Sequence, residues 1–198
     1  MSKEMIRIAN CSGFYGDKLS IAKEMVEGGP IDVLTGDYLA ELTMTILYNQ
    51  KMKRGEEHGY VGTFIKQFRD VAKISQDKNI KIVTNAGGLN PKSMAQEIEK
   101  VVDELNLDLK VSYIDGDNLI PEMEKLTKLG EKFSNLDKNI DLKDYSKKAI
   151  TANAYLGAWG IKEALDNGAD VVVCPRVTDA AVVIAVSYTH LRAHETRS

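Results

Sequence analysis

The sequence predicts an α/β fold of the doubly wound, Rossmann-like type, in which a mostly parallel sheet is covered by helices on both faces. Two observations support this prediction. Short apolar stretches, typical of buried strands, alternate with longer amphipathic stretches, typical of helices. Loops rich in Gly, Asp and Asn follow most of the predicted strands. A β/α barrel produces the same alternation, so a partial barrel is the alternative.

Strand and helix alternate twice in the first part of the chain. Residues 5–9 form a short apolar run that predicts a strand, and residues 17–27 have the spacing of an amphipathic helix, which a Gly-Gly-Pro sequence ends. Residues 31–35 predict a second strand. Gly36 and Asp37 then open a second helix, whose apolar residues face the core.

The same alternation continues after a charged linker. Apolar residues spaced three and four apart between Phe64 and Ile74 predict the third helix. Residues 80–84 predict the next strand. Pro91 suits the first turn of the following helix, which runs to about residue 105, because the N–H that proline lacks is not needed there.

A polar excursion interrupts the alternation in the second half of the chain. Residues 109–114 predict a strand and residues 117–129 a helix, but residues 131–148 are polar and show no periodicity. We expect this last segment to leave the domain. The alternation then resumes with a strand, a helix and a strand over residues 150–153, 156–167 and 170–174.

The last residues break the pattern. Residues 180–185 predict an apolar helix, whereas residues 186–198 have no partner in the preceding alternation and resemble the translation of a transposase sequencing adapter. We therefore expect one incomplete α/β domain over residues 1–185 and a non-native tail over residues 186–198. His190 and His194 have the spacing of a helical zinc pair, but they lie in this tail, so we expect no zinc site from them.

Composition narrows the class of protein. The chain has 198 residues, of which 43% are hydrophobic and 28% charged, and this suits one main domain with a sizeable core. A net charge of −3 with both signs interspersed predicts no nucleic-acid partner. No apolar run approaches the roughly 20 residues that span a bilayer, so no membrane partner is expected. Cys11 and Cys174 are not a spaced pair, which favours a reduced, cytoplasmic protein.

Polar residues follow the C-terminal ends of the predicted strands, where both candidate architectures bind ligands. Each loop taken alone is explained by a turn or a helix cap. Six such loops at one edge of a sheet predict a pocket, and side-chain amides and glycine backbone suit an anionic ligand. The residues expected to bind the substrate are Asn10, Ser12, Gly13, Asn85, Gly87, Gly88, Asn90, Asn153, Arg176, Thr178 and Asp179.

Three carboxylates and one arginine are candidates for the chemistry. Asp37 and Asp117 share the pattern Gly-Asp-x-Leu directly after a strand, and Glu41 follows Asp37 by one helical turn. These carboxylates are the expected catalytic groups, with Asp37 and Glu41 either sharing a proton or binding a divalent cation, although acidic residues also favour helix starts for purely structural reasons. Arg176 has the planar fork that suits a carboxylate or phosphate, and a surface ion pair with Asp179 is its structural alternative.

Five of these strand-end segments resemble one known family. They include Asn-Cys-Ser-Gly-Phe-Tyr-Gly, Asn-Ala-Gly-Gly-Leu-Asn-Pro and Arg-Val-Thr-Asp, and they lie at residues 7–17, 29–42, 85–91, 151–157 and 176–180. The resemblance is to the N-terminal domain of the acyclic terpene utilisation family and covers about residue 7 to residue 183. It implies a bacterial protein that acts in the breakdown of citronellol- and geraniol-type compounds, alongside biotin-dependent acyl-CoA carboxylases, dehydrogenases and hydratases. Family chains are longer, so the resemblance also implies a truncated domain.

Two hypotheses about function follow. In the first, the chain is an enzyme of terpenoid or branched-chain acyl-CoA or carboxylate catabolism, of the lyase, hydratase or hydrolase class. Arg176 and the backbone of residues 85–90 hold the anionic group, while Asp37 or Asp117 moves a proton or positions a metal. In the second, the chain is a non-catalytic protein that binds an acyl-CoA or docks to a carboxylase of the pathway. A homo-oligomer is compatible with both.

Overall fold

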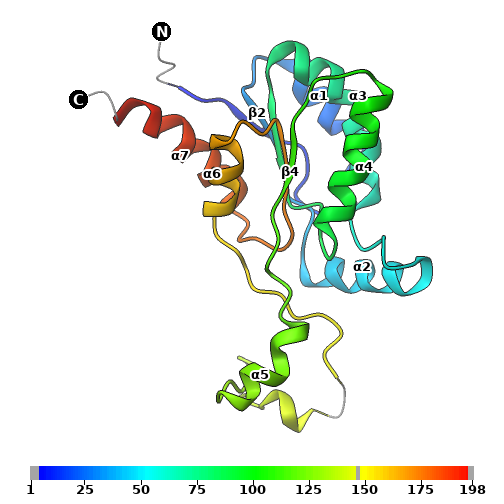
Figure 1. The fold of residues 1–198 in the computed structure, drawn as a ribbon, viewed down its shortest axis with the longest axis vertical. Helices are drawn as coiled ribbons and strands as arrows, with labels where there is room; N and C mark the ends of the chain where they lie inside the picture. Colours follow the sequence, from blue (N-terminus) through cyan, green and yellow to red (C-terminus); the bar gives the residue numbers. More distant parts are fainter. Residues whose placement is uncertain (1–4, 146–147, 196–198) are drawn as a thin grey trace.

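The core of the protein is an open sheet of five parallel strands in the order β1-β2-β3-β5-β4. The computed structural model describes residues 5–145 and 148–195 (Figure 1). The strands are β1 (Ile8–Asn10), β2 (Val33–Gly36), β3 (Lys81–Thr84), β4 (Val111–Tyr113) and β5 (Val171–Val173). The prediction of an α/β fold with a parallel sheet is confirmed. In a barrel each strand pairs with the next one along the chain, so the position of β5 between β3 and β4 excludes the barrel alternative for the described residues.

The central strands are buried on both faces of the sheet. Every residue of β2 and β5 is buried. Leu34 and Ile82 belong to one core cluster, whereas Val33, Val83 and Val172 belong to another. This division follows from the pleat, because successive side chains of a strand point to opposite faces. A sheet with two buried faces therefore needs the nearly continuous apolar runs from which these strands were predicted.

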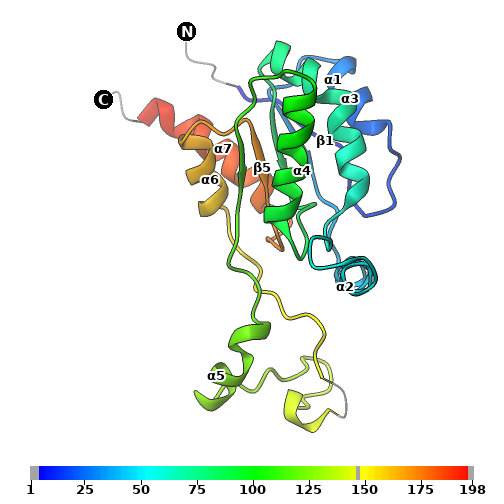
Figure 2. The ribbon, with the colours of Figure 1, turned by 45° about the vertical axis from the view of Figure 1, so that its right-hand side comes forward.

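Helices cover the two faces of the sheet, as Figures 1 and 2 show. Phe64, Phe68 and Ile98 fill the core beneath the first layer of helices, and Ile161 and Ala185 fill the core beneath the second. The described part of the chain contains no helix with both the length and the apolar character needed to cross a membrane. The first layer consists of α1 (Ile21–Gly28), α3 (Gly62–Lys78) and α4 (Pro91–Glu104), and the second of α6 (Trp159–Asp166) and α7 (Ala181–Glu195).

The second helix begins later than predicted. It was expected to open at Asp37, but α2 (Glu41–Arg54) begins four residues further on. The N–H of Asp37 donates to the carbonyl of Ser12 at 3.0 Å, and the N–H of Tyr38 donates to Asn85 Oδ1 at 2.7 Å. Contacts with neighbouring loops thus hold the chain after β2 extended, and this prediction was wrong because those contacts are not visible in a local pattern.

The connections after β3 and β5 leave the sheet on opposite sides. The chain runs from β3 into α4 on the first face and from β5 into α7 on the second. Because β3 and β5 are neighbours, the topological switch point of the sheet lies between their C-terminal ends. In open α/β sheets this is the position at which ligands bind.

A long excursion, which we call the arm and define as residues 118–152, projects from the same end of the sheet (Figure 2). It contains the short helix α5 (Met123–Lys128), flanked by the single turns η1 (Ile120–Glu122) and η2 (Leu142–Asp144). None of the described residues of the arm is buried. The expected excursion is therefore present, but the helix predicted over residues 117–129 is limited to α5 and the η1 turn before it.

The strand predicted over residues 150–153 does not join the sheet. Instead, the outgoing and returning segments at the base of the arm pair with each other through an isolated antiparallel bridge between Asn118 and Asn153. The N–H of Leu119 donates to the carbonyl of Ala152 at 2.7 Å, on the arm side of this bridge. The prediction was wrong because the returning chain satisfies its backbone groups with the outgoing chain rather than with a sheet strand.

Helix α7 continues beyond the apolar run from which it was predicted. It extends through residue 195, and Val186 is buried in the second core cluster. The ring of Tyr188 lies 5.4 Å from the ring of Trp159 in an edge-to-face arrangement. Residues 186–195 therefore continue the helix, and Val186 and Tyr188 pack against neighbouring residues. The non-native origin of residues 186–198 stays a prediction, and residues 196–198 lie outside the described residues.

Candidate functional site

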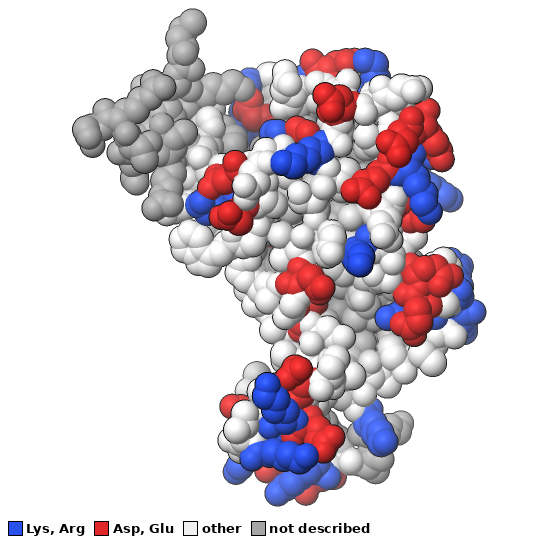
Figure 3. Space-filling view, in the orientation of Figure 1, with Lys and Arg blue, Asp and Glu red and all other residues white. Residues whose placement is uncertain are grey.

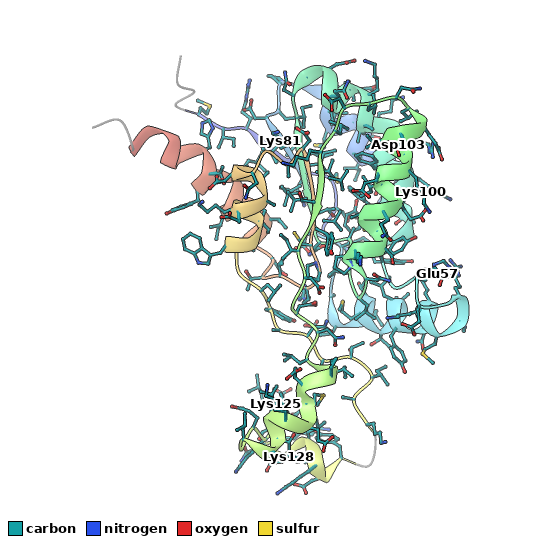
Figure 4. All side chains as sticks on the ribbon, viewed as in Figure 1. Glu57, Lys81, Lys100, Asp103, Lys125 and Lys128 are labelled. Carbon is teal, nitrogen blue, oxygen red and sulfur yellow. The ribbon has the colours of Figure 1, made fainter. Side chains whose placement is uncertain are left out.

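The candidate site lies at the C-terminal ends of β2, β3 and β5, beside the base of the arm. Lys81, at the start of β3, marks the opposite end of the sheet, while Lys125 and Lys128 lie in the arm (Figure 4). Elsewhere on the surface, cationic and anionic side chains are mixed on the face that Figure 3 shows. The site is thus distinguished by a buried arginine with carboxylates around it and not by an excess of one charge.

Arg176 is the central residue of the site. Its side chain is only 6% exposed. Nη1 donates to the carbonyl of Leu39 at 2.9 Å and to Asp179 Oδ1 at 3.4 Å, and Nη2 lies 3.8 Å from Glu41 Oε1. The guanidinium carbon lies 4.1 Å from the centre of the Tyr155 ring, which is a cation–π distance. Burial opposes the charge of Arg176, but Tyr155 and the two carboxylates outweigh it and raise its pKa, so the group stays charged.

Asp37 is held next to this arginine by Asn85. The buried Asn85 donates from Nδ2 to Asp37 Oδ1 at 2.5 Å, while its Oδ1 accepts the N–H of Tyr38. Asp37 is half-buried, and burial raises the pKa of its carboxyl above the ordinary range. The hydrogen bond from Asn85 and the charge of Arg176 lower this pKa, and the charge of Asp179 raises it further. The net effect is still a raised pKa, because burial is the largest cause. A carboxyl group with a raised pKa beside a fixed cation suits proton transfer.

Asp117 connects the base of the arm to the loop after β5. Its side chain is buried, and Oδ2 accepts the N–H of Arg176 at 3.2 Å and Nδ2 of Asn153 at 2.7 Å. Its backbone carbonyl accepts the N–H of Ala154 at 2.7 Å. Burial raises the pKa of Asp117, against the hydrogen bonds from Asn153 and Arg176. These contacts attach Asp117 and Asn153 to the backbone of Arg176 as a structural connection.

The loop after β1 uses its own carboxylate where an anionic ligand was expected. The N–H groups of Gly13 and Phe14 donate to Asp17 Oδ2 at 2.6 and 3.2 Å. The hydroxyl of Ser12 donates to the carbonyl of Phe14, and Asn10 Nδ2 donates to the carbonyl of Ser12. This turn also delays helix α1, which was predicted from residue 17 and begins at residue 21. The substrate-binding roles of Asn10, Ser12 and Gly13 stay predictions.

The loop after β3 is also occupied by contacts within the chain. A Cβ atom at Gly87 would lie 2.5 Å from the carbonyl oxygen of Cys174, which directly follows the neighbouring strand β5. Asn90 caps α4 by accepting the N–H of Ser93 at 3.1 Å, and its Nδ2 donates to the carbonyl of Glu56. Thus Gly87 and Asn90 have sufficient structural roles, and their roles in binding stay predictions.

Replacing Gly88 with Ala is expected to destabilise the protein by about 1–2 kcal/mol. Gly88 has φ = +55°, in the left-handed region that disfavours a Cβ atom, and this atom would overlap the Cδ1 of Leu47. Chemical denaturation measures the difference. Gly62→Ala is the matched control, because a Cβ atom there meets nothing within 4 Å. Equal stability of the two variants would contradict the conformational requirement.

The structure thus brings only some of the expected residues together. Asp37, Asn85, Glu41, Asp179 and Arg176 form one group through hydrogen bonds, ion pairs or direct electrostatic influence. Thr178 is exposed and donates its N–H to the carbonyl of Leu156. The sequence-based interpretation missed Tyr155, because it considered only polar and glycine residues at strand ends. Its position in the segment 151–157, where the family resemblance was noted, was the available signal.

A divalent cation has little support from the geometry. Asp37 and Glu41 were candidate ligands, but Asp37 accepts from Asn85, and Glu41 accepts from the hydroxyl of Tyr155 and faces Arg176. Among the described residues, no group of three or more His, Cys, Asp or Glu side chains is arranged to hold a metal ion. The cation that these carboxylates face is the guanidinium itself.

Comparison with known proteins gives one match. The model of the family described as acyclic terpene utilisation family protein AtuA matches residues 6–193. Neither the curated proteins nor the solved structures contain a match. The matched range includes all five strands of the sheet and the loops that form the candidate site. The chain therefore belongs to the acyclic terpene utilisation family, AtuA.

Proposed function

We propose that this protein is an enzyme of acyclic terpenoid or branched-chain catabolism that binds an acyl-CoA or a carboxylate and transfers a proton. Family membership associates the chain with acyclic terpene utilisation. The observation that carries the finer proposal is the pairing of a buried arginine with a half-buried carboxyl of raised pKa at the switch point of the sheet. Arg176 would hold the anionic group, and Asp37 would remove or deliver a proton at an adjacent carbon.

The lyase and hydratase classes fit this pair better than the hydrolase class. A hydrolase that forms a covalent intermediate needs an activated nucleophile. Cys11 is buried, burial raises the pKa of its thiol, and no histidine bonds to it in the described contacts. The hydroxyl of Ser12 is buried and donates to the carbonyl of Phe14. Proton transfer by Asp37 needs neither group, so the reaction we propose is an addition to, or an elimination from, the acyl chain.

A second candidate function is favoured by the arm. Leu129 and Leu136 are 74% and 100% exposed, so both apolar side chains of the arm are available for contact with a partner protein. In this case the chain would bind an acyl-CoA without catalysis, or dock to a carboxylase of the pathway. A homo-oligomer formed through the arm would be compatible with either function.

Ligand-dependent thermal stability tests the proposed site. Acyclic terpenoid acyl-CoA esters, the free acids and inorganic phosphate are added in turn to the protein. A ligand at 100 times its Kd should stabilise the fold by about 2.7 kcal/mol. Arg176→Gln should lose this stabilisation, whereas Arg69→Gln should keep it, because Arg69 lies on α3 and pairs only with the exposed Glu104 in the described contacts. Stabilisation that Arg176→Gln retains would contradict the anion site, and no stabilisation together with carboxylase binding would favour the second candidate.

A further inference from the structure

Tyr155 lies on the chain that returns from the arm, directly against the guanidinium of Arg176. It is 51% exposed, so burial in the core does not account for its position. The following residue is fixed to the loop after β5, since the N–H of Leu156 donates to the carbonyl of Arg176 at 3.2 Å and its carbonyl accepts the N–H of Thr178 at 2.9 Å. The backbone therefore holds the tyrosine ring over one face of the guanidinium.

The hydroxyl of Tyr155 contacts a second residue of the site. It donates a hydrogen bond to Glu41 Oε1, the same oxygen that lies 3.8 Å from Arg176 Nη2. A distance of 3.8 Å is within ion-pair range but is too long for a hydrogen bond. Glu41 is 82% exposed and sits at the first position of α2. The shortest contact of the carboxylate is thus with the tyrosine and not with the arginine.

The two edges of the guanidinium differ in consequence. Nη1 is occupied by the carbonyl of Leu39 and by Asp179, whereas Nη2 faces a carboxylate that stops short of bonding to it. If Tyr155 did not hold the Glu41 side chain, its carboxylate would compete with any anionic ligand for Nη2. A group on the same chain is an effective competitor because its local concentration is high. Restraint of Glu41 therefore leaves Nη2 able to donate a hydrogen bond to an external oxygen.

We propose that Tyr155 is a positioning residue of the anion site: its ring fixes the plane of the Arg176 guanidinium, and its hydroxyl restrains Glu41 so that Nη2 can receive a carboxylate or phosphate oxygen. This inference rests on the proposed function, because it assumes that Arg176 binds an external anion. It assigns Glu41 the role of an internal competitor, in place of the catalytic role expected from the sequence. A planar guanidinium held in one orientation loses less freedom when it binds an oxyanion.

A double-mutant cycle with inorganic phosphate as the probe tests the hydroxyl. Tyr155→Phe keeps the ring but releases Glu41, and we expect it to weaken phosphate binding by about two- to fivefold, which is the scale of an exposed ion pair. Glu41→Gln should bind phosphate as well as or better than the unsubstituted protein. The double variant Y155F/E41Q should bind like E41Q, because no charged competitor is left to release. Tyr113→Phe is the control, since Tyr113 is a part-exposed tyrosine on the edge strand β4.

The ring is tested without any ligand. An arginine side chain that rotates freely gives averaged Nη signals in NMR spectra, so the Nη signals of Arg176 should be resolved in the unsubstituted protein and in Y155F but merged in Tyr155→Leu. Resolved signals in Y155L would overturn the role of the ring.

The outcomes separate this inference from the proposed function. If Y155F binds phosphate as well as the unsubstituted protein, or if E41Q does not restore the binding that Y155F loses, the role of the hydroxyl is overturned. The anion site itself is not contradicted by either result. Failure of the unsubstituted protein to bind phosphate, any acyl-CoA or any carboxylate would overturn the proposed function, and the role of Tyr155 with it. Thermal melts of each variant confirm that the fold is intact.

Discussion

Replacing Asp37 with Asn is expected to lower kcat of the proposed proton transfer by about 10²- to 10⁴-fold. The amide has the same shape, and its oxygen can still accept the hydrogen bond that Asn85 donates at 2.5 Å. The fold should therefore remain, while the group that gains and loses the proton is absent. Turnover of an acyclic terpenoid acyl-CoA or acid measures the loss, and thermal melts report the fold.

The pH dependence should identify the same group. Burial raises the pKa of Asp37 above the ordinary value of about 3.9. If Asp37 acts as a base, kcat/KM should fall as the pH drops through this raised pKa, and the acid limb of the profile should disappear in Asp37→Asn. The raised pKa of Asp37 also affects the free energy of unfolding. Its stabilising contribution is fully present below the unfolded pKa, where the carboxyl is protonated, and is lost as the pH rises through the folded pKa.

A matched variant separates a charge effect from a catalytic one. Asp77 lies on the exposed side of α3, where it pairs with Lys73, so Asp77→Asn removes one carboxylate far from the strand ends. This variant should keep both kcat and the acid limb. If Asp37→Asn kept full activity, Asp37 would not be the group that transfers the proton, and the Arg176 site would be a binding site only.

The layered fold could be predicted from the sequence because each central strand carries its own signal. A run such as Val171–Val173 is apolar throughout, as a strand with two buried faces requires. The order of the strands carries no comparable local signal. The insertion of β5 between β3 and β4 depends on pairings such as Val83 with Val172, which join residues far apart in the chain. A sheet and a barrel therefore could not be distinguished before the pairing was seen.

The candidate site was predictable only in outline. Polar residues at strand ends indicated the correct edge of the sheet, because parallel strands bring their C-terminal ends to one side. Which of these residues face a ligand depends on contacts across the fold. Gly13 bonds to Asp17 and Gly87 packs against Cys174, whereas Arg176 is surrounded by residues from three separate loops. The residues alone do not show this difference.

Asp117 shows how the same sequence pattern serves two roles. Both Asp37 and Asp117 follow glycine after a strand, and both were expected to be catalytic. Replacing Asp117 with Ala is expected to lower the free energy of unfolding by about 2–4 kcal/mol, because one buried and one part-buried donor lose their acceptor. These donors are Nδ2 of Asn153 and the N–H of Arg176, and both bond to Oδ2 of Asp117. Chemical denaturation monitored by circular dichroism measures the change.

The amide variant distinguishes a structural Asp117 from a catalytic one. In Asp117→Asn one oxygen remains to accept from Asn153 and Arg176, and a buried charge is removed, so the stability at neutral pH should stay within about 1 kcal/mol of the unsubstituted protein. Asp115→Ala is the control, since Asp115 is exposed and accepts only the N–H of Gly116 in the described contacts. If Asp117 is structural, Asp117→Asn should also keep its turnover. A stable Asp117→Asn variant without activity would instead return Asp117 to the chemistry.

The pH dependence of stability provides an independent check on the same residue. Burial raises the pKa of Asp117, so its folded form binds a proton more tightly than its unfolded form. The stability that this adds is fully present below the unfolded pKa and is lost as the pH rises through the folded pKa. The unsubstituted protein should therefore gain stability relative to Asp117→Asn as the pH falls through the folded pKa of Asp117. A difference that stays constant down to the unfolded pKa would mean that the hydrogen bonds from Asn153 and Arg176 offset the burial of Asp117, and a loss of stability as the pH falls would mean that they outweigh it.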